Sequence, residues 1–163
     1  LVVAELPPVP ADKLPGADRI VALEQLQDSG NVGTILRTAE AMGFRGVIAD
    51  QSGDVFSPKL LRASAGSAFR LSLCYGSLAA LLPRAADAGY TIFGTTLRPE
   101  AVPLDQAVFP PKTIVVVGNE GQGTTDEILA LCTHQLTIPM KGRIQSLNAA
   151  IAAAMILWQA NHS

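Results

Sequence analysis

The sequence has little of what marks secreted, membrane-spanning or metal-binding proteins. It contains only two cysteines, Cys74 and Cys132, which lie far apart in apolar surroundings. This spacing predicts neither a disulfide framework nor a metal site. No uninterrupted apolar run approaches the roughly 20 residues needed to cross a bilayer, and residues 1–5 lack the basic region and long apolar core of a signal peptide. We therefore expect a soluble, cytoplasmic protein without a metal.

Positive charge is also scarce. The 163 residues include 12 Lys and Arg against 14 Asp and Glu, which gives a net charge of −2. Binding nucleic acid through bulk electrostatics requires a strongly basic face, so an RNA-binding role would need locally concentrated positive charge. The candidates are Arg37, Lys59, Arg62, Arg70, Arg98, Lys141 and Arg143. The alternative is that these residues are scattered solubilising charges.

Proline and glycine are concentrated in residues 7–16, which predicts a stiff, irregular linker over residues 1–16. The remaining residues, 17–163, fit one domain of the usual size of roughly 100–200 residues. Since the chain does not begin with Met, we expect a further segment to precede the linker.

From Arg19 onward, short β-rich runs alternate with helical stretches, which is typical of an α/β domain with a mainly parallel sheet. The run at 114–117 has no polar alternation and predicts a central strand covered on both faces. Strands are predicted at Ile20–Glu24, Gly46–Ala49, Thr91–Gly94, Ile114–Val117 and Gln135–Ile138, and helices at Asn31–Met42, Leu78–Ala88, Thr125–Leu131 and Leu147–Asn161.

The last predicted helix is rich in alanine and apolar around its circumference. Its larger residues Leu147, Ile151, Met155 and Trp158 follow one another at spacings of four, four and three, which places them on one stripe. A helix that is apolar on all sides must be buried on more than one of them. The stripe therefore predicts either a position inside the core or a contact with a second subunit.

Three loops combine glycines with polar residues after a predicted strand, where open α/β sheets bind ligands. The first, residues 27–39, contains Asn31 and Arg37. Both side chains can reach one site only if the loop folds to bring them together. The alternative is that Asn31 caps the helix and that Arg37 forms an ion pair with Glu40 or Glu24.

The second loop, residues 117–124, follows the predicted central strand. Its three glycines permit close approach of the backbone to a ligand. Thr124 and Glu127 could form a capping box that starts the next helix, but this scheme does not explain Glu120. The alternative is a tight turn with an exposed Glu120.

The third loop, residues 138–148, leads into the alanine-rich helix. Ser146 is a candidate N-cap. Asn148, in the first turn of a buried helix, would be costly unless its amide had partners. This suggests a ligand or a contact between subunits.

These three loops, in this order and with Lys59-Leu60-Leu61-Arg62-Ala63-Ser64-Ala65-Gly66 between the first two, resemble the motifs of the SpoU or TrmH-like family of RNA ribose 2′-O-methyltransferases, within the SPOUT superfamily. The match extends from about Arg19 to the C-terminus. Two departures are small. Ser29 stands where family members often have proline, and Ala149-Ala150 stands where bulkier residues are common.

The resemblance implies an α/β domain with a C-terminal trefoil knot, a homodimer in which the knot regions meet, and rRNA or tRNA as substrate. It also implies S-adenosylmethionine as cofactor, held bent and largely by backbone groups. Residues 2–7 resemble the link that follows a small RNA-binding domain in two-domain relatives. By the same resemblance, cofactor binding is expected of Thr95, Gly118, Asn119, Gly121, Ile138, Met140, Leu147 and Asn148, catalysis of Asn31, Arg37, Glu120, Ser146 and Asn148, and RNA binding of Arg37, Lys59, Arg62, Lys141 and Arg143.

Methyl transfer to a ribose requires in-line attack of the 2′-oxygen on a sulfonium methyl group, so most of the catalysis is positioning. Arg37 is the family's usual candidate for taking the hydroxyl proton. Because a guanidinium remains protonated, we expect Arg37 instead to hold an RNA phosphate and to stabilise developing oxyanion charge.

Two other functions fit parts of the sequence. Gly30-Asn31-Val32-Gly33, with Asp50 about 20 residues further on, partly matches the fingerprint of a dinucleotide-binding oxidoreductase. Asp28 replaces the first glycine of that fingerprint and would repel pyrophosphate. A catalytically inactive RNA-binding module is the other alternative, and retention of the five expected catalytic residues argues against it.

Overall fold

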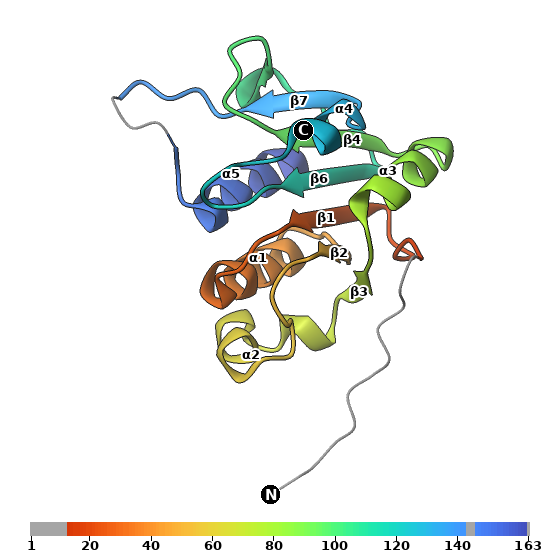
Figure 1. Ribbon diagram of the computed structural model, residues 1–163, viewed down its shortest axis with the longest axis vertical. Coiled ribbons are helices and arrows are strands. Elements are labelled where there is room, and N and C mark those ends of the chain that lie inside the picture. The colour runs from red at the N-terminus through yellow and green to blue at the C-terminus, as the bar shows by residue number, and fades with distance from the viewer. Residues whose placement is uncertain (1–12, 143–145, 163) are drawn as a thin grey trace, which may run out of the picture.

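A seven-stranded parallel sheet forms the centre of the computed structural model, which describes residues 13–142 and 146–162 (Figure 1). The strand order is β3-β2-β1-β6-β4-β7-β5, and every pairing is parallel. The strands are β1 (Arg19–Glu24), β2 (Gly46–Asp50), β3 (Ser72–Tyr75), β4 (Thr91–Thr95), β5 (Val102–Pro103), β6 (Thr113–Val117) and β7 (His134–Thr137).

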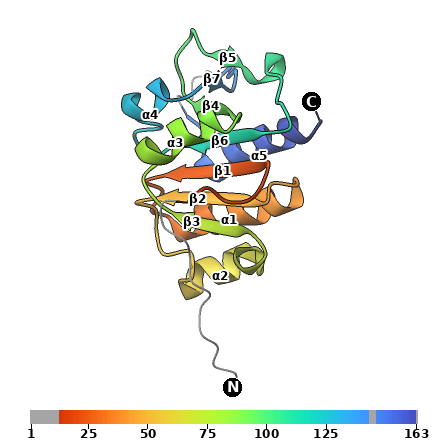
Figure 2. The ribbon, with the colours of Figure 1, turned by 90° about the vertical axis from the view of Figure 1, so that its right-hand side faces the viewer.

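Helices cover both faces of this sheet (Figures 1 and 2). One face packs against α1 (Ser29–Ala41), α2 (Pro58–Ser64) and α5 (Ala149–His162). The other packs against α3 (Leu78–Asp87) and α4 (Asp126–Ala130). Two short 3₁₀ helices, Ser67–Phe69 and Leu104–Gln106, complete the fold. The predicted α/β class with a mainly parallel sheet is confirmed.

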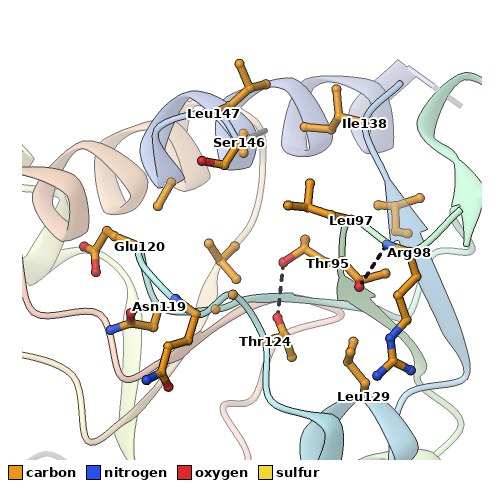
Figure 3. A pocket seen from close by; sticks show the side chains of 18 of the residues that line it. Thr95, Leu97, Arg98, Asn119, Glu120, Thr124, Leu129, Ile138, Ser146 and Leu147 are labelled. Carbon is orange, nitrogen blue, oxygen red and sulfur yellow. Dashed lines mark hydrogen bonds between the residues drawn. The ribbon is translucent and has the colours of Figure 1, made fainter. Parts of the chain in front are cut away.

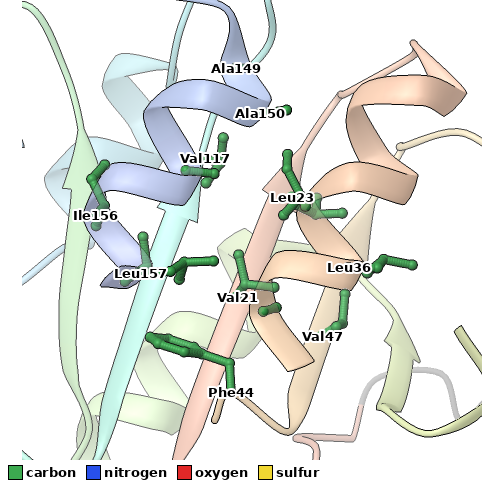
Figure 4. Packing of buried hydrophobic residues seen from close by; sticks show 14 of the residues in the cluster. Val21, Leu23, Leu36, Phe44, Val47, Val117, Ala149, Ala150, Ile156 and Leu157 are labelled. Carbon is green, nitrogen blue, oxygen red and sulfur yellow. The ribbon is translucent and has the colours of Figure 1, made fainter. Parts of the chain in front are cut away.

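The two central strands, β1 and β6, are buried on both faces. Along β1, Val21 and Leu23 belong to the core beneath α1 and α5 (Figure 4), while Ile20 and Ala22 belong to the core beneath α3. This alternation follows from the two-residue period of a strand. β6 behaves in the same way, because all five of its residues are buried. The prediction of a central strand at 114–117 is confirmed.

Five strands and four helices lie where the sequence predicts them, and each end differs from the predicted end by two residues or fewer. The last helix begins at Ala149, two residues later than predicted. The edge strands β3 and β5 were not predicted, because β3 is only partly buried and β5 has two residues. Nor was α2, although Ser57 at its N-cap and Pro58 at its first position are a helix-start signal.

The stripe formed by Leu147 and by residues of α5 is exposed in the single chain. Leu147, Ile151, Met155 and Trp158 are 37%, 54%, 43% and 52% exposed. The opposite side of the helix, which includes Ile156 and Leu157, is buried against the sheet (Figure 4). The sequence predicted either a position inside the core or a contact with a second subunit for this stripe. A core position within this chain is wrong.

The described residues offer no metal site and no membrane span. They contain no group of three or more His, Cys, Asp or Glu that could hold an ion, and none of their helices is long and apolar enough to cross a bilayer. Both cysteines are free thiols. Burial, followed by the nearby Glu24 carboxylate, raises the pKa of Cys132 to about 12.

Most of the predicted linker, residues 1–12, lies outside the described residues. Within the remainder, Leu14 and Ala17 pack against the core beneath α3, and the Tyr90 hydroxyl donates to the Ala17 carbonyl at 2.7 Å. The folded domain therefore includes residues from Leu14 onward. The trefoil knot stays a prediction.

Candidate functional site

A cavity of about 590 Å³ opens at the carboxyl edge of the sheet (Figure 3). Its walls are the loops that follow β4, β6 and β7, together with the residues that lead into α5. Parallel strands bring their carboxyl ends to one edge, which is why segments distant in sequence meet there. The lining combines apolar side chains with a loop rich in glycine, as is typical of a pocket for a small molecule.

The loop after β6, residues 118–124, is folded tightly upon itself. A Cβ built on Gly118 would lie 2.1 Å from the Thr124 nitrogen and 2.2 Å from the Gly123 carbonyl carbon, so only glycine fits. The Asn119 side-chain oxygen accepts hydrogen bonds from the Gly121 and Gln122 nitrogens at 2.8 and 3.3 Å. These contacts leave Glu120 exposed at the tip of the turn.

Thr125, not Thr124, caps the following helix. The Thr125 hydroxyl accepts from the Ile128 nitrogen at 3.4 Å. The Thr124 hydroxyl instead lies 3.3 Å from that of Thr95 in the wall of the cavity (Figure 3). The predicted capping box of Thr124 and Glu127 is therefore wrong by one residue, and Thr124 is a lining residue that sequence reasoning missed.

Side chains from the three loops form one hydrogen-bonded chain. The Asn31 side-chain nitrogen donates to Glu120 Oε1 at 3.2 Å, and the Asn148 side-chain nitrogen donates to Asn31 Oδ1 at 3.0 Å. Asn31 can bridge its two neighbours because an amide has both a donor and an acceptor. Three residues expected to be catalytic are thus brought together.

Asn31 is available for this role because another residue caps α1. The Asp28 carboxylate accepts from the Asn31 backbone nitrogen at 2.8 Å, so the capping role considered for Asn31 is wrong. That hydrogen bond, followed by one from Lys59, lowers the pKa of Asp28.

Asn148 serves α5 in a similar way. Its side-chain oxygen accepts from the Ala150 and Ile151 nitrogens at 2.9 and 3.2 Å, which makes Asn148 rather than Ser146 the residue that caps the helix. Asn148 is exposed, and its amide is satisfied by Asn31 and by its own helix.

Arg37 does not belong to this cluster. It is exposed on α1 and does not line the cavity. The suggested ion pairs with Glu40 and Glu24 are wrong, because Glu40 pairs with Arg70 and Glu24 accepts from Thr125. Within residues 13–142 and 146–162, no hydrogen bond or ion pair occupies the Arg37 guanidinium.

The residues expected to bind the cofactor lie together with one exception. Asn148 is outside the cavity lining. The lining includes Thr95, Gly118, Asn119, Gly121, Ile138, Met140 and Leu147, together with two residues expected to be catalytic, Glu120 and Ser146.

Sequence reasoning missed several lining residues, notably Leu97, Arg98, Thr124, Asp126 and Leu129. Most of the segment after β4 has no glycine or motif that would mark it. Arg98 was considered a free cation for RNA, but its guanidinium pairs with Asp126 at 2.6 Å on the cavity wall.

The other candidate RNA-binding cations are dispersed. Lys59 pairs with Asp28 at 3.3 Å. Arg62 and Lys141 are exposed and have no partner among the described residues, whereas Arg143 lies outside them. The described domain therefore offers Arg37, Arg62 and Lys141 as uncommitted positive charges from this set.

The dinucleotide-binding alternative does not fit the geometry. The Asp50 carboxylate accepts from the Leu78 nitrogen at 2.8 Å and so holds the start of α3 instead of facing the cavity. A Cβ on Gly33 would lie 2.5 Å from that of Ala63, so this glycine permits close packing of α1 against α2. Neither residue of the partial fingerprint is placed to bind a ligand in this cavity.

Comparisons with known proteins identify the family to which this chain is related. The model of the SpoU rRNA Methylase family matches residues 18–158. The chain is 43% identical over 143 residues to an uncharacterized tRNA/rRNA methyltransferase of Synechocystis sp., and 32% identical over 151 residues to the 23S rRNA (guanosine(2553)-2′-O)-methyltransferase of Bacillus subtilis. These alignments cover 86% and 92% of this chain.

Two solved structures have the same fold. The AdoMet-bound rRNA methyltransferase of Sinorhizobium meliloti superimposes with a TM-score of 0.85 at 31% identity, covering 93% of this chain and 59% of that one. The SpoU methyltransferase AviRb of Streptomyces viridochromogenes, in complex with the cofactor AdoMet, superimposes with a TM-score of 0.81 at 32% identity, covering 94% and 65%.

The chain spans only 52% and 60% of the Synechocystis and Bacillus proteins, so the relationship concerns the region shared with them. That region contains the parallel sheet, the three loops and the cavity. The family model covers most of it in a single match. The chain therefore belongs to the SpoU rRNA Methylase family.

Proposed function

We propose that this domain transfers a methyl group from S-adenosylmethionine to a ribose 2′-hydroxyl of RNA. The observation that carries the proposal is the hydrogen-bonded chain of Glu120, Asn31 and Asn148, of which Glu120 also lines the cavity. Relatives named as ribose 2′-O-methyltransferases of rRNA and of tRNA support both RNA classes as substrates.

The cavity fits S-adenosylmethionine in chemistry. Leu129, Leu136 and Ile138 offer an apolar wall suited to a purine, and the Glu120 carboxylate complements the positive charge of a sulfonium group. The polar backbone of residues 118–123 supplies hydrogen-bonding groups in the same cavity. When bound, the cofactor supplies a methyl group on a positively charged sulfur.

The residues of this chain position the substrate. Asn31, held between Glu120 and Asn148, presents a fixed amide beside the cavity, and such fixed groups lower the barrier by orienting the attacking oxygen. Ser146, which lines the cavity, provides a hydroxyl there. Neither His134 nor His162 lines the cavity.

We assign Arg37 to the RNA rather than to proton abstraction. Its guanidinium remains protonated, and a guanidinium recognises phosphate oxygens in two-pronged geometry. Arg62 and Lys141 would add phosphate contacts. Because so few of the candidate RNA-binding cations are uncommitted in the described part of the chain, we further propose that an RNA-binding domain preceding residues 1–16 supplies additional contacts.

We also propose that the protein works as a homodimer through α5 and that the domain contains a C-terminal trefoil knot. The exposed stripe of Leu147, Ile151, Met155 and Trp158 supports the dimer, because contiguous apolar surface of this kind marks an interaction site. Leu147 lines the cavity as well, so the interface would adjoin the site.

The decisive test combines binding with product analysis. Calorimetry should detect binding of S-adenosylmethionine and none of NAD. Incubation of the protein with labelled S-adenosylmethionine and total RNA should place the label on ribose 2′-oxygens. Methylation of a 2′-oxygen makes the neighbouring phosphodiester resistant to alkaline cleavage, which identifies the product. Label on a base, or binding of NAD alone, would overturn the proposal. Comparing RNA from cells with and without the gene would then identify the nucleotide.

A further inference from the structure

Glu24 is a buried carboxylate next to the cavity loop. It is the last residue of β1, is 2% exposed, and is the one charged side chain found in the core of the described residues. Its two oxygens accept from a single residue, the backbone nitrogen of Thr125 at 3.1 Å and the Thr125 hydroxyl at 2.6 Å. Burying a carboxylate is costly without such bonds, so this contact must fix Thr125 closely.

The neighbouring residue Gln25 holds the other end of the same loop. The Asn119 side-chain nitrogen donates to the Gln25 carbonyl at 2.9 Å. Gln25 presents that carbonyl from a left-handed conformation, with φ of 54°, and its own nitrogen donates to the Asp50 carbonyl at 2.9 Å. The end of β1 therefore holds both Asn119 and Thr125, and the five residues between them line the cavity.

We propose that Glu24 is a positioning residue for cofactor binding, which acts through Thr125 to set the conformation of residues 118–124. The inference rests on the proposed function. Thr124, which adjoins Thr125, shares a hydroxyl contact of 3.3 Å with Thr95 in the cavity wall. Thr125 also caps α4, which contributes Asp126 and Leu129 to the lining. Displacing Thr125 would therefore move both Thr124 and α4.

A shorter or uncharged side chain at position 24 cannot accept the same two hydrogen bonds from Thr125. Glu24→Ala removes both acceptors and leaves the Thr125 nitrogen and hydroxyl unpaired. Glu24→Asp keeps the charge but cannot span the same distance. Glu24→Gln keeps the shape, offers one acceptor in place of two, and should restore part of the function.

Asp50→Asn is the matched control. Asp50 also ends a strand, β2, and its carboxylate also accepts from the first turn of a helix, at Leu78 in α3. It does not line the cavity and does not contact residues 118–125 through its side chain. A general loss of stability would affect this variant as it affects those of Glu24.

Three measurements test the proposal. Calorimetry with S-adenosylmethionine should show affinity lowered at least about tenfold in Glu24→Ala, less in Glu24→Gln, and little in Asp50→Asn. In steady-state assays the KM for S-adenosylmethionine should rise while the KM for RNA is unchanged. Amide hydrogen exchange without cofactor should accelerate in peptides covering 118–125 in Glu24→Ala, and not in those peptides in Asp50→Asn.

Variants of the partner residue decide the case if Glu24→Ala does not fold. Thr125→Ser keeps the hydroxyl and should bind S-adenosylmethionine like the parent, whereas Thr125→Val should lose affinity. The losses of Thr125→Val and Glu24→Gln should not add in the double variant, because both break one contact.

Unchanged affinity in folded Glu24→Ala or Thr125→Val would overturn the proposal, as would an equal loss in Asp50→Asn. If the parent protein binds no S-adenosylmethionine, the proposed function fails instead. Hydrogen exchange at 118–125 then still reports whether Glu24 holds the loop.

Discussion

The side-chain amide of Asn148 donates to the side-chain oxygen of Asn31 at 3.0 Å, although 117 positions separate the two residues. The bond joins the residue that caps α5 to the first turn of α1. Asn31 passes the contact on to Glu120, so a change at any of the three affects the geometry of the others.

Replacing Asn31 with aspartate tests this chain of contacts. Asn31→Asp still accepts from Asn148 but turns a second carboxylate toward Glu120, and like charges at this separation repel. Methyl transfer should fall about 10²-fold, a typical cost of losing one fixed polar group beside a reacting centre. Asn161→Asp, which changes an exposed amide that does not line the cavity, should retain full activity. Normal turnover in Asn31→Asp would refute a role for the chain.

Arg37→Ala should separate RNA binding from cofactor binding. The affinity for S-adenosylmethionine should stay nearly intact, because Arg37 does not line the cavity. Turnover should drop, and the slope of log affinity for RNA against log salt should flatten by about one contact. Isothermal titration measures the affinity for S-adenosylmethionine, and filter binding at two salt concentrations measures the salt dependence of the affinity for RNA. Loss of cofactor binding in a folded variant would contradict the role assigned to Arg37.

Gly118 and Gly121 of the cavity loop should tolerate substitution differently. Gly118→Ala places a Cβ against the Thr124 backbone and should abolish cofactor binding by misfolding the loop, whereas a Cβ on Gly121 meets only the Asn119 side-chain oxygen, at 3.5 Å. Gly121→Ala should therefore fold normally and bind more strongly than Gly118→Ala. Titration with S-adenosylmethionine and thermal melting would compare them, and equal affinities would show that loop packing does not matter.

Charge on the α5 stripe should break the dimer. Light scattering of the parent protein should return twice the 17.0 kDa mass of the chain, and Ile151→Glu with Met155→Glu should return the monomer mass. Val108→Glu alters an exposed apolar residue that is not on α5 and should leave the dimer intact. A monomeric parent at micromolar concentration would exclude the proposed assembly.

The ion pair between Glu40 and Arg70 predicts a dependence of stability on pH. Hydrogen bonds from Arg70, and then from Ser67, lower the pKa of Glu40 from 4.5 to about 2. Because the folded-state pKa is depressed, ionised Glu40 stabilises the fold above pH 4.5, and this contribution is lost as the pH falls toward 2. Arg70→Gln should reduce stability above this window and flatten the dependence within it.

Urea melts at several pH values between 5 and 2.5 would measure that dependence. Arg62→Gln is the control, because Arg62 is exposed and has no partner within the described ranges. The same slope in Arg70→Gln and in the parent would assign the dependence to other carboxylates.

The sequence predicted the sheet well because its strands are apolar and most lie between amphipathic helices. It also identified the residues of all three loops. It could not predict which hydroxyl or amide performs which task, since Thr124 and Thr125, or Ser146 and Asn148, differ by one or two positions and have the same capping propensity. Only the hydrogen bonds in the structure show that Thr125 and Asn148 cap helices.

Two further features depend on contacts between segments distant in sequence. Arg98 and Lys59 are indistinguishable from free surface cations until Asp126 and Asp28 are placed beside them. The segment after β4 enters the cavity because β4 lies between β6 and β7 in the sheet, and no local pattern contains that order.

The strand order also determines when the domain can be completed during synthesis. β6 lies between β1 and β4, and both of those strands are made before it. Until residues 113–117 leave the ribosome, β1 and β4 each present an unpaired edge with apolar residues on both faces, and such edges readily pair with other chains. A nascent chain arrested between β4 and β6 should therefore need chaperone protection. The arrival of β6 should lessen that need by pairing β1 with β4 through one strand, and the other edge of β4 is covered only when β7 follows.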